Sequence, residues 1–284
     1  MTKRQIWWLL IIPCVLVAAA MIASLLGVFQ FSFRRFIPGS LSAGGFTLDN
    51  FYGMARPIYL LVILDTLLIS FLTAVFCLIL SYPVAYALVR TTKEWLRTLL
   101  VILAITPLFT GEIVRTYAWM LVLGTQGFIN SALLSIGLID TPLQFMYTRF
   151  GVVVALVHFS MPVMIILLAT AIGHVNRDCE KAAANLGAPP LSVFWCVTVP
   201  LTMPGIIAGT VVIFAWTMSA FATPQLIGGG KVLMISNLVY LQGLSSFNFP
   251  LAAMLSLIAF IAAIGSLGAI QPIVARLERR VALQ

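Results

Sequence analysis

The sequence predicts an all-α polytopic membrane protein with six transmembrane helices and a helical cytoplasmic loop between the fourth and the fifth. Of its 284 residues, 62% are hydrophobic and 8% are charged, whereas soluble domains are about half apolar and a quarter charged. The apolar residues form runs of about 20 residues or more, the length that a helix needs to cross the hydrocarbon layer. Basic residues gather in the short segments between these runs, as in cytoplasmic loops of membrane proteins.

Each apolar run is long enough to be a span. The first run follows Lys3 and Arg4, as in a signal peptide, but it exceeds the apolar region of such a peptide, so we expect an uncleaved helix. The second contains one charge, Asp65, and the third is interrupted by Glu112 and Arg115. We expect residues 1–284 to form a single transmembrane domain. Its expected spans are at about 7–29, 58–89, 99–123, 152–172, 201–222 and 251–273, and a helical loop is expected at 173–200.

The distribution of basic residues predicts the orientation. Six spans put both termini on one side, and with the N-terminus inside, the inner segments hold ten of the sixteen Lys and Arg residues. Positive charge marks the cytoplasmic side, and Trp7, Trp8 and Trp95 lie at the predicted inner interface. The net charge of +8 is not accompanied by a segment that is both basic and aromatic, so we expect no nucleic-acid partner.

No constellation in the sequence predicts catalysis, a metal site or a cofactor. The four cysteines have no CxxC spacing, and His158 and His174 lie far apart. Gly230-Lys231 does not complete a phosphate-binding loop, because Gln225 and Val232 stand where that motif requires Gly and Ser or Thr. We therefore expect a protein that is not an enzyme and has no ATP site of its own.

The loop at 173–200 has the pattern of a capped helical hairpin. Asp178 and Glu180 stand in the first turn of a polar helix, where negative charge meets the positive end of the helix dipole. An Ala run at 182–184 favours helix, and Gly187 is suited to the position after its end. A second short helix leads to Pro200. Such a hairpin is either a surface feature without a partner or a surface to which another protein binds.

The spacing in this loop resembles the EAA loop of the integral-membrane permeases of binding-protein-dependent ABC importers. That pattern reads Glu-Ala-Ala, three residues, Gly, nine residues, then Ile-x-Leu-Pro. The matching residues here are Ala182, Ala183, Gly187, Val197, Val199 and Pro200, whereas Lys181 occupies the glutamate position and Glu180 precedes it. The resemblance implies a coupling helix that docks into an ATPase, with Glu180, Lys181, Ala182, Ala183, Gly187 and Pro200 as the ATPase-coupling residues.

Other segments resemble the spermidine/putrescine type of these permeases. The segments are Gly-Phe-Thr-Leu-Asp-Asn-Phe at 45–51, Tyr-Pro-Val-Ala-Tyr at 82–86, Arg-Thr-Tyr-Ala-Trp at 115–119, Gly-Phe-Ile-Asn at 127–130, and 224–231. The resemblance implies a permease subunit of an ATP-driven polyamine importer. Related permeases for opines, ferric iron and other small solutes share much of the pattern, so those substrates remain alternatives.

The same resemblance implies the partners and the compartment. We expect a multi-pass protein of the bacterial inner membrane with cytoplasmic termini, paired with a second permease as a heterodimer. ABC ATPase subunits would hydrolyse ATP, and an extracytoplasmic binding protein would dock on outer loops near Asp49, Arg56 or Lys231. An ion-driven secondary transporter is the rival, but such a fold would need inverted repeats and more intramembrane ionisable groups.

Polar groups at membrane depth usually face a cavity or a partner. One interpretation of Asp65 and Glu112 is a path for a polycation, with Tyr117, Trp119, Trp216 and Phe221 contributing cation–π contacts, and Tyr147 as a further aromatic. The alternative is structural: a Glu112–Arg115 pair and an interfacial Asp65. We expect His158 to bond to a neighbouring helix, and Gly205 and Gly209 to allow close helix packing within the subunit or with its partner.

Overall fold

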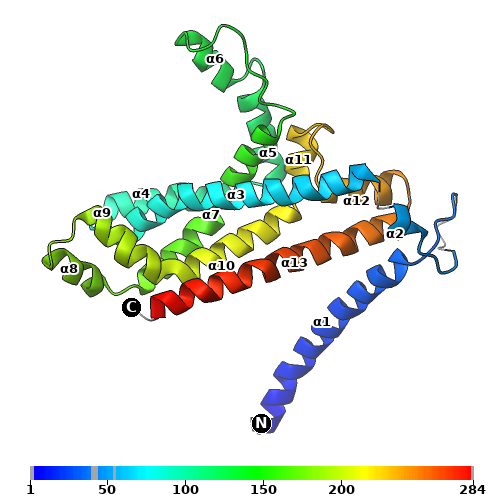
Figure 1. Ribbon diagram of the computed structural model, residues 1–284, viewed down its shortest axis with the longest axis horizontal. Helices are drawn as coiled ribbons and strands as arrows, with labels where there is room; N and C mark the ends of the chain where they lie inside the picture. Colours follow the sequence, from blue (N-terminus) through cyan, green and yellow to red (C-terminus); the bar gives the residue numbers. More distant parts are fainter. Residues whose placement is uncertain (1–2, 40–43, 54–55, 283–284) are drawn as a thin grey trace. The chain divides into compact units, whose positions relative to one another are not determined.

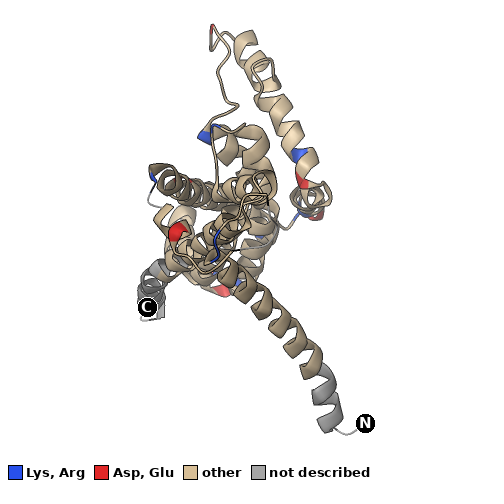
Figure 2. Cartoon of the chain, turned by 90° about the vertical axis from the view of Figure 1, so that its right-hand side faces the viewer, with Lys and Arg blue, Asp and Glu red and all other residues tan. Residues whose placement is uncertain are grey.

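The computed structural model describes residues 3–39, 44–53 and 56–282 (Figure 1). These residues form helices joined by loops, and their one β feature is an isolated antiparallel bridge between Arg34 and Phe46. The predicted all-α class is therefore confirmed. Charged positions are few along the ribbon, and long stretches of helix carry none (Figure 2).

The helices follow one another with short connections. In chain order they are α1 (Lys3–Ser32), α2 (Asp49–Gly53), α3 (Pro57–Arg90), α4 (Glu94–Ile105), α5 (Glu112–Leu123), α6 (Phe128–Ser135), α7 (Arg149–His174), α8 (Arg177–Asn185), α9 (Pro190–Val193), α10 (Val199–Met218), α11 (Ala222–Ile227), α12 (Ile235–Tyr240) and α13 (Phe249–Ala282). A 3₁₀ turn follows α4 at Thr106–Phe109, and π turns occupy Phe194–Thr198 and Leu241–Ser245.

Four stretches of the described chain are long and apolar enough to cross a membrane, and up to six if two bent pairs count as single spans. The four are Ile11–Ser32, Pro57–Arg90, Arg149–His174 and Phe249–Ser266. The bent pairs are Glu94–Phe109 with Glu112–Ser135, at 106°, and Pro190–Leu201 with Met203–Met218, at 67°.

The expected third span, 99–123, thus falls on two helices rather than one. Pro107 lies in the 3₁₀ turn, and Gly111 precedes the first residue of α5 in an extended conformation. A proline cannot donate to the helical ladder, so Pro107 favours an end of the regular α-helix at this point. The two charges that interrupt the apolar run are both on α5, beyond the bend.

The packing of the chain divides it into two compact units, residues 1–61 with 235–262 and residues 62–234 with 263–284. In the first unit, the segment after α1 is held by Asn50. Its amide nitrogen donates to the carbonyl oxygens of Ser32 and Arg34, both at 2.9 Å. Phe33 stacks on Phe46, with ring centroids 5.6 Å apart.

In the second unit, α7 and α10 lie side by side (Figure 1). Gly205 and Gly209 of α10 make their close approach possible: a Cβ at Gly205 would overlap Ala171, and one at Gly209 would lie 2.8 Å from the sulfur of Met164. Small residues at this spacing let helix backbones approach in a membrane. The expected close packing of these glycines therefore occurs within the subunit.

Candidate functional site

The hairpin formed by α8 and α9 (the α8–α9 hairpin, residues 177–193) is fixed by caps at both ends of α8. The side-chain oxygen of Asn176 accepts a hydrogen bond from the Asp178 amide at 2.9 Å. Gly187 has φ +87°, its amide donates to the carbonyl of Ala184 at 2.9 Å, and the next amide donates to Ala183. This pair of bonds is a Schellman motif, which needs the left-handed residue that glycine supplies.

The second arm of the hairpin continues into the following span. After α9, a π turn at Phe194–Thr198 leads directly into α10, with Pro200 in its first turn. The helical path bends by 67° near residue 202 but does not pass through a loop. The hairpin is therefore joined to α10 by bent helical backbone rather than by a loop.

Glu180 is bound inside the protein. Its Oε1 lies 2.8 Å from Nη2 of Arg90, the last residue of α3, and both side chains are largely buried, at 14% and 12% exposed. The hydroxyl of Thr198 donates to the same oxygen at 2.9 Å. Arg177 adds a bond to the carbonyl of Val89 at 2.7 Å. The hairpin is thus joined to the end of α3 by charged groups.

Aromatic contacts make a second connection between α3 and this region. Phe194 makes T-shaped contacts with the rings of Tyr82 and Tyr86, with centroids 5.4 and 5.5 Å apart. The Tyr82 hydroxyl also shares a hydrogen bond with the hydroxyl of Thr202 at 2.8 Å. The Tyr-Pro-Val-Ala-Tyr segment therefore braces the π turn after α9 and the first turns of α10.

The outer side of the hairpin is open. Lys181 is 70% exposed and pairs with the equally exposed Asp178 at 3.0 Å. Leu186, Leu191 and Trp195 are 90%, 70% and 61% exposed. Leu186 and Leu191 lie on the hairpin and Trp195 in the π turn that follows it, and we call these three side chains the apolar patch.

The six residues expected to couple to an ATPase differ in their exposure to solvent. Lys181, Ala182 and Gly187 are exposed, Ala183 and Pro200 are half-buried, and Glu180 faces inward. The sequence interpretation missed the apolar patch. Leucines on both sides of the Gly187 turn were the available signal, since a hairpin that faces only water has no need of them.

The residues expected to line a substrate path are divided among several places. Asp65 is paired: Nη2 of Arg149 lies 2.9 Å from both of its oxygens. Trp119 donates its ring N–H to His158 at 3.2 Å, so the expected bond from His158 to a neighbouring helix is confirmed.

Glu112, Trp216 and Phe221 come together at one cavity of about 250 Å³ in the second unit. The other residues that line it are Leu156, Phe159, Ser160, Thr217, Ser219, Ala220 and Ala222. Glu112 forms no ion pair with Arg115 within 4 Å, although the two stand one helical turn apart. The guanidinium of Arg115 lies instead over the ring of Phe159, 4.2 Å from its centroid.

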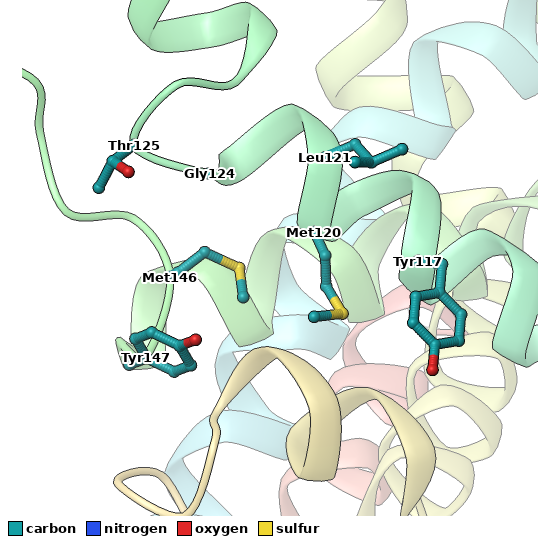
Figure 3. Close-up of a pocket in the computed structure, with 7 residues that line it drawn as sticks. All are labelled: Tyr117, Met120, Leu121, Gly124, Thr125, Met146 and Tyr147. Carbon is teal, nitrogen blue, oxygen red and sulfur yellow. The ribbon is translucent and has the colours of Figure 1, made fainter.

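Tyr117 lines a second cavity, of about 390 Å³, with Tyr147 on its other side (Figure 3). Met120 and Met146 point into the space between the two rings. Tyr147 has φ +62°, and its amide donates to the carbonyl of Ile227 at 2.9 Å. The remaining lining residues are Leu121, Gly124 and Thr125.

Comparison with known proteins identifies relatives of this chain. Residues 77–282 match the model of a family described as "Binding-protein-dependent transport system inner membrane component". The spermidine/putrescine transport system permease protein PotB of Escherichia coli strain K12 is 36% identical over 212 residues, 75% of this chain and 77% of that protein. PotB of Haemophilus influenzae is 32% identical over 74% of this chain and 73% of that protein.

A solved structure has the same fold. One chain of the crystal structure of a bacterial alginate ABC transporter, in complex with an alginate pentasaccharide-bound periplasmic protein, superposes with a TM-score of 0.79. The alignment covers 96% of each chain at 16% identity.

These matches are to components of binding-protein-dependent transport systems and favour that kind of transport over an ion-driven carrier. The family model matches more than half of the chain, and two relatives exceed 30% identity over about three quarters of it. The chain therefore belongs to the family of binding-protein-dependent transport system inner membrane components.

Proposed function

We propose that this chain is the membrane-spanning permease subunit of an ATP-driven importer for a polyamine, spermidine or putrescine, in a bacterial inner membrane. The names of its relatives support the substrate, and the family supports the inner membrane. The observation that supports the transport role best is the α8–α9 hairpin, whose outer side is open and whose Glu180 is bound to Arg90 at the end of α3.

A separate ABC ATPase docks on this hairpin. The apolar patch, Leu186, Leu191 and Trp195, supplies the buried area, with Lys181 and Asp178 at its edge. Exposed apolar side chains of this size bury favourably at an interface. Glu180 contributes indirectly, because its carboxylate is bound to Arg90 and Thr198 and so sets the angle of α8. ATP is hydrolysed in that subunit.

Closure of the ATPase pair moves the hairpin as one body. The buried Arg90–Glu180 pair carries the movement to α3, and the bent helical backbone from α9 through the π turn carries it to α10. Packed helices respond to such a displacement by switching between discrete arrangements. The translocation path thereby changes from inward-facing to outward-facing.

The path forms between this chain and a second, different permease. Both termini and the α8–α9 hairpin lie in the cytoplasm, as the concentration of Lys and Arg in the short inner segments supports. An extracytoplasmic binding protein delivers the substrate to the outer loops. Asp49, Arg56 and Lys231 are the charged residues of those loops that we assign to its docking.

A zwitterionic solute such as an opine is the second candidate substrate. One observation favours it: Nε and Nη1 of Arg115 are buried and have no hydrogen-bond partner in the described part of the chain. A carboxylate would satisfy both donors. The ammonium groups of a polyamine would not.

The coupling role is tested by purifying the chain with the products of its neighbouring genes. An ATPase is expected to co-purify, and Gly187→Trp is expected to release it or to separate its activity from transport, because a tryptophan strains the left-handed turn. Gly137→Trp is the matched control: Gly137 has φ +68°, and it too has open space around it, away from the hairpin. A complex that forms without any ATPase, or equal behaviour of the two variants, would contradict the proposal.

A further inference from the structure

The cavity around Glu112 combines a carboxylate with three aromatic side chains. Glu112 lies in the first turn of α5, Phe159 on α7, Trp216 on α10, and Phe221 directly before α11. These positions all belong to the second compact unit. The cavity, at about 250 Å³, has room for part of an extended amine rather than for a large solute.

The Glu112 carboxylate has no hydrogen bond or ion pair to any residue that the structure describes. It is half-buried, and its position at the N-terminus of α5 stabilises its negative charge through the helix dipole. An unpaired carboxylate beside apolar rings is costly unless a cation completes the site.

The rings can bind a cation. The Arg115 guanidinium already occupies a position 4.2 Å from the centroid of Phe159, within the range of a cation–π contact. Phe159 in turn meets Trp216 edge to face, with centroids 5.8 Å apart. The aromatic wall of the cavity thus already holds one positive group, and Trp216, which is partly exposed, presents a further ring surface.

We propose that this cavity is an alkylammonium site on the translocation path, in which Glu112 binds one ammonium group of the substrate and Trp216 and Phe221 flank it. The proposal rests on the polyamine-import function and identifies where this chain would hold the substrate. Arg115 limits the affinity: its charge, one turn from Glu112, weakens the attraction without cancelling it. A site on a transport path must release its ligand as well as bind it.

The roles of Glu112 and Arg115 predict opposite effects. Glu112→Gln removes the attraction, so the KM for polyamine uptake is expected to rise by about tenfold, the factor that 1.4 kcal/mol gives. Arg115→Gln removes the repulsion, so both KM and kcat are expected to fall. Glu94→Gln is the control, since Glu94 is exposed in the first turn of α4 and lines neither cavity.

Direct occupancy is measured by protection of a cysteine in the cavity. Ser219 lines it and is exposed, so Ser219→Cys can be labelled with a neutral maleimide in the intact complex once Cys14, Cys77, Cys179 and Cys196 are replaced. Butylammonium at about twice its Kd is expected to slow labelling about threefold. Glu112→Gln is expected to abolish this protection, and butanol should give none.

Each outcome has a distinct meaning. If butylammonium protects the cysteine but the complex does not import spermidine, the alkylammonium site is supported and the polyamine-import function is contradicted. If the complex imports spermidine but labelling is equal in all conditions, the alkylammonium site is contradicted and the polyamine-import function is supported. Loss of uptake in Arg115→Gln, together with protection by glutamate or an opine but not by butylammonium, overturns the proposal in favour of a zwitterion site.

Discussion

At the scale of single residues, the contact partners of Glu180 and Arg115 cannot be predicted from the spacing of charged residues along the sequence. Glu180 was expected near an ATPase, yet its carboxylate contacts Arg90, ninety positions earlier. The i, i+3 spacing of Glu112 and Arg115 allows an ion pair, but Arg115 lies over Phe159. Both outcomes depend on which helices lie side by side, and a local pattern does not contain that information.

The Arg90–Glu180 pair yields a stability prediction. Glu180→Ala leaves a buried guanidinium without its partner, which is expected to cost the complex about 3–5 kcal/mol and to lower its midpoint of thermal unfolding. Lys181→Ala is the matched control, because its exposed pair with Asp178 is worth no more than about 1 kcal/mol.

A double variant distinguishes the loss of the ion pair from the cost of leaving one buried charge without a partner. Arg90→Met with Glu180→Met replaces two buried charges by apolar groups, so we expect most of the lost stability to return while ATPase coupling stays impaired. Equal unfolding midpoints for Glu180→Ala and Lys181→Ala would show that Glu180 is not held as described.

At the scale of elements, the hairpin and its Gly187 turn follow from rules that act within a few residues. The acidic first turn, the alanines and the left-handed glycine are all local signals, and the structure has each of them in place. The bend inside the expected third span was not predicted. Pro107 and Gly111 are the local signals for it, but the apolar run continues across both residues, and a run of that length is typical of a single span.

The contact between α7 and α10 gives a prediction for two glycines. Gly205→Ala is expected to destabilise the protein by about 1–3 kcal/mol, because its Cβ overlaps Ala171 and the packed helices must separate. Gly173→Ala is expected to be neutral or to stabilise α7 by up to about 1 kcal/mol, since open space surrounds it.

Urea or thermal unfolding in detergent measures both variants against the wild type. If Gly205→Ala were as stable as Gly173→Ala, α10 would not pack on α7 as closely as the structure indicates.

At the scale of the whole molecule, the segments that carry the family resemblance mainly hold the fold together. Asn50 closes the loop after α1, Tyr82 braces α10, and the fully buried Asn130 bonds to the backbone of Gly124 and Leu143. The resemblance therefore predicted the family correctly, because it reflects shared architecture. The cavity that we propose as the substrate site includes Phe159, which no motif of the sequence marked, and the contact of Arg115 with that ring was equally invisible to a local pattern.

In the proposed function, ATP drives the import of a polyamine through this chain and its partner permease. The most direct measurement is uptake of labelled spermidine into proteoliposomes that contain the complete complex, with the binding protein outside and ATP inside. We predict uptake that requires both and that is lost with Gly187→Trp but retained with Gly137→Trp. Uptake that follows an ion gradient without ATP, or no uptake of spermidine while another solute is imported, would contradict this account.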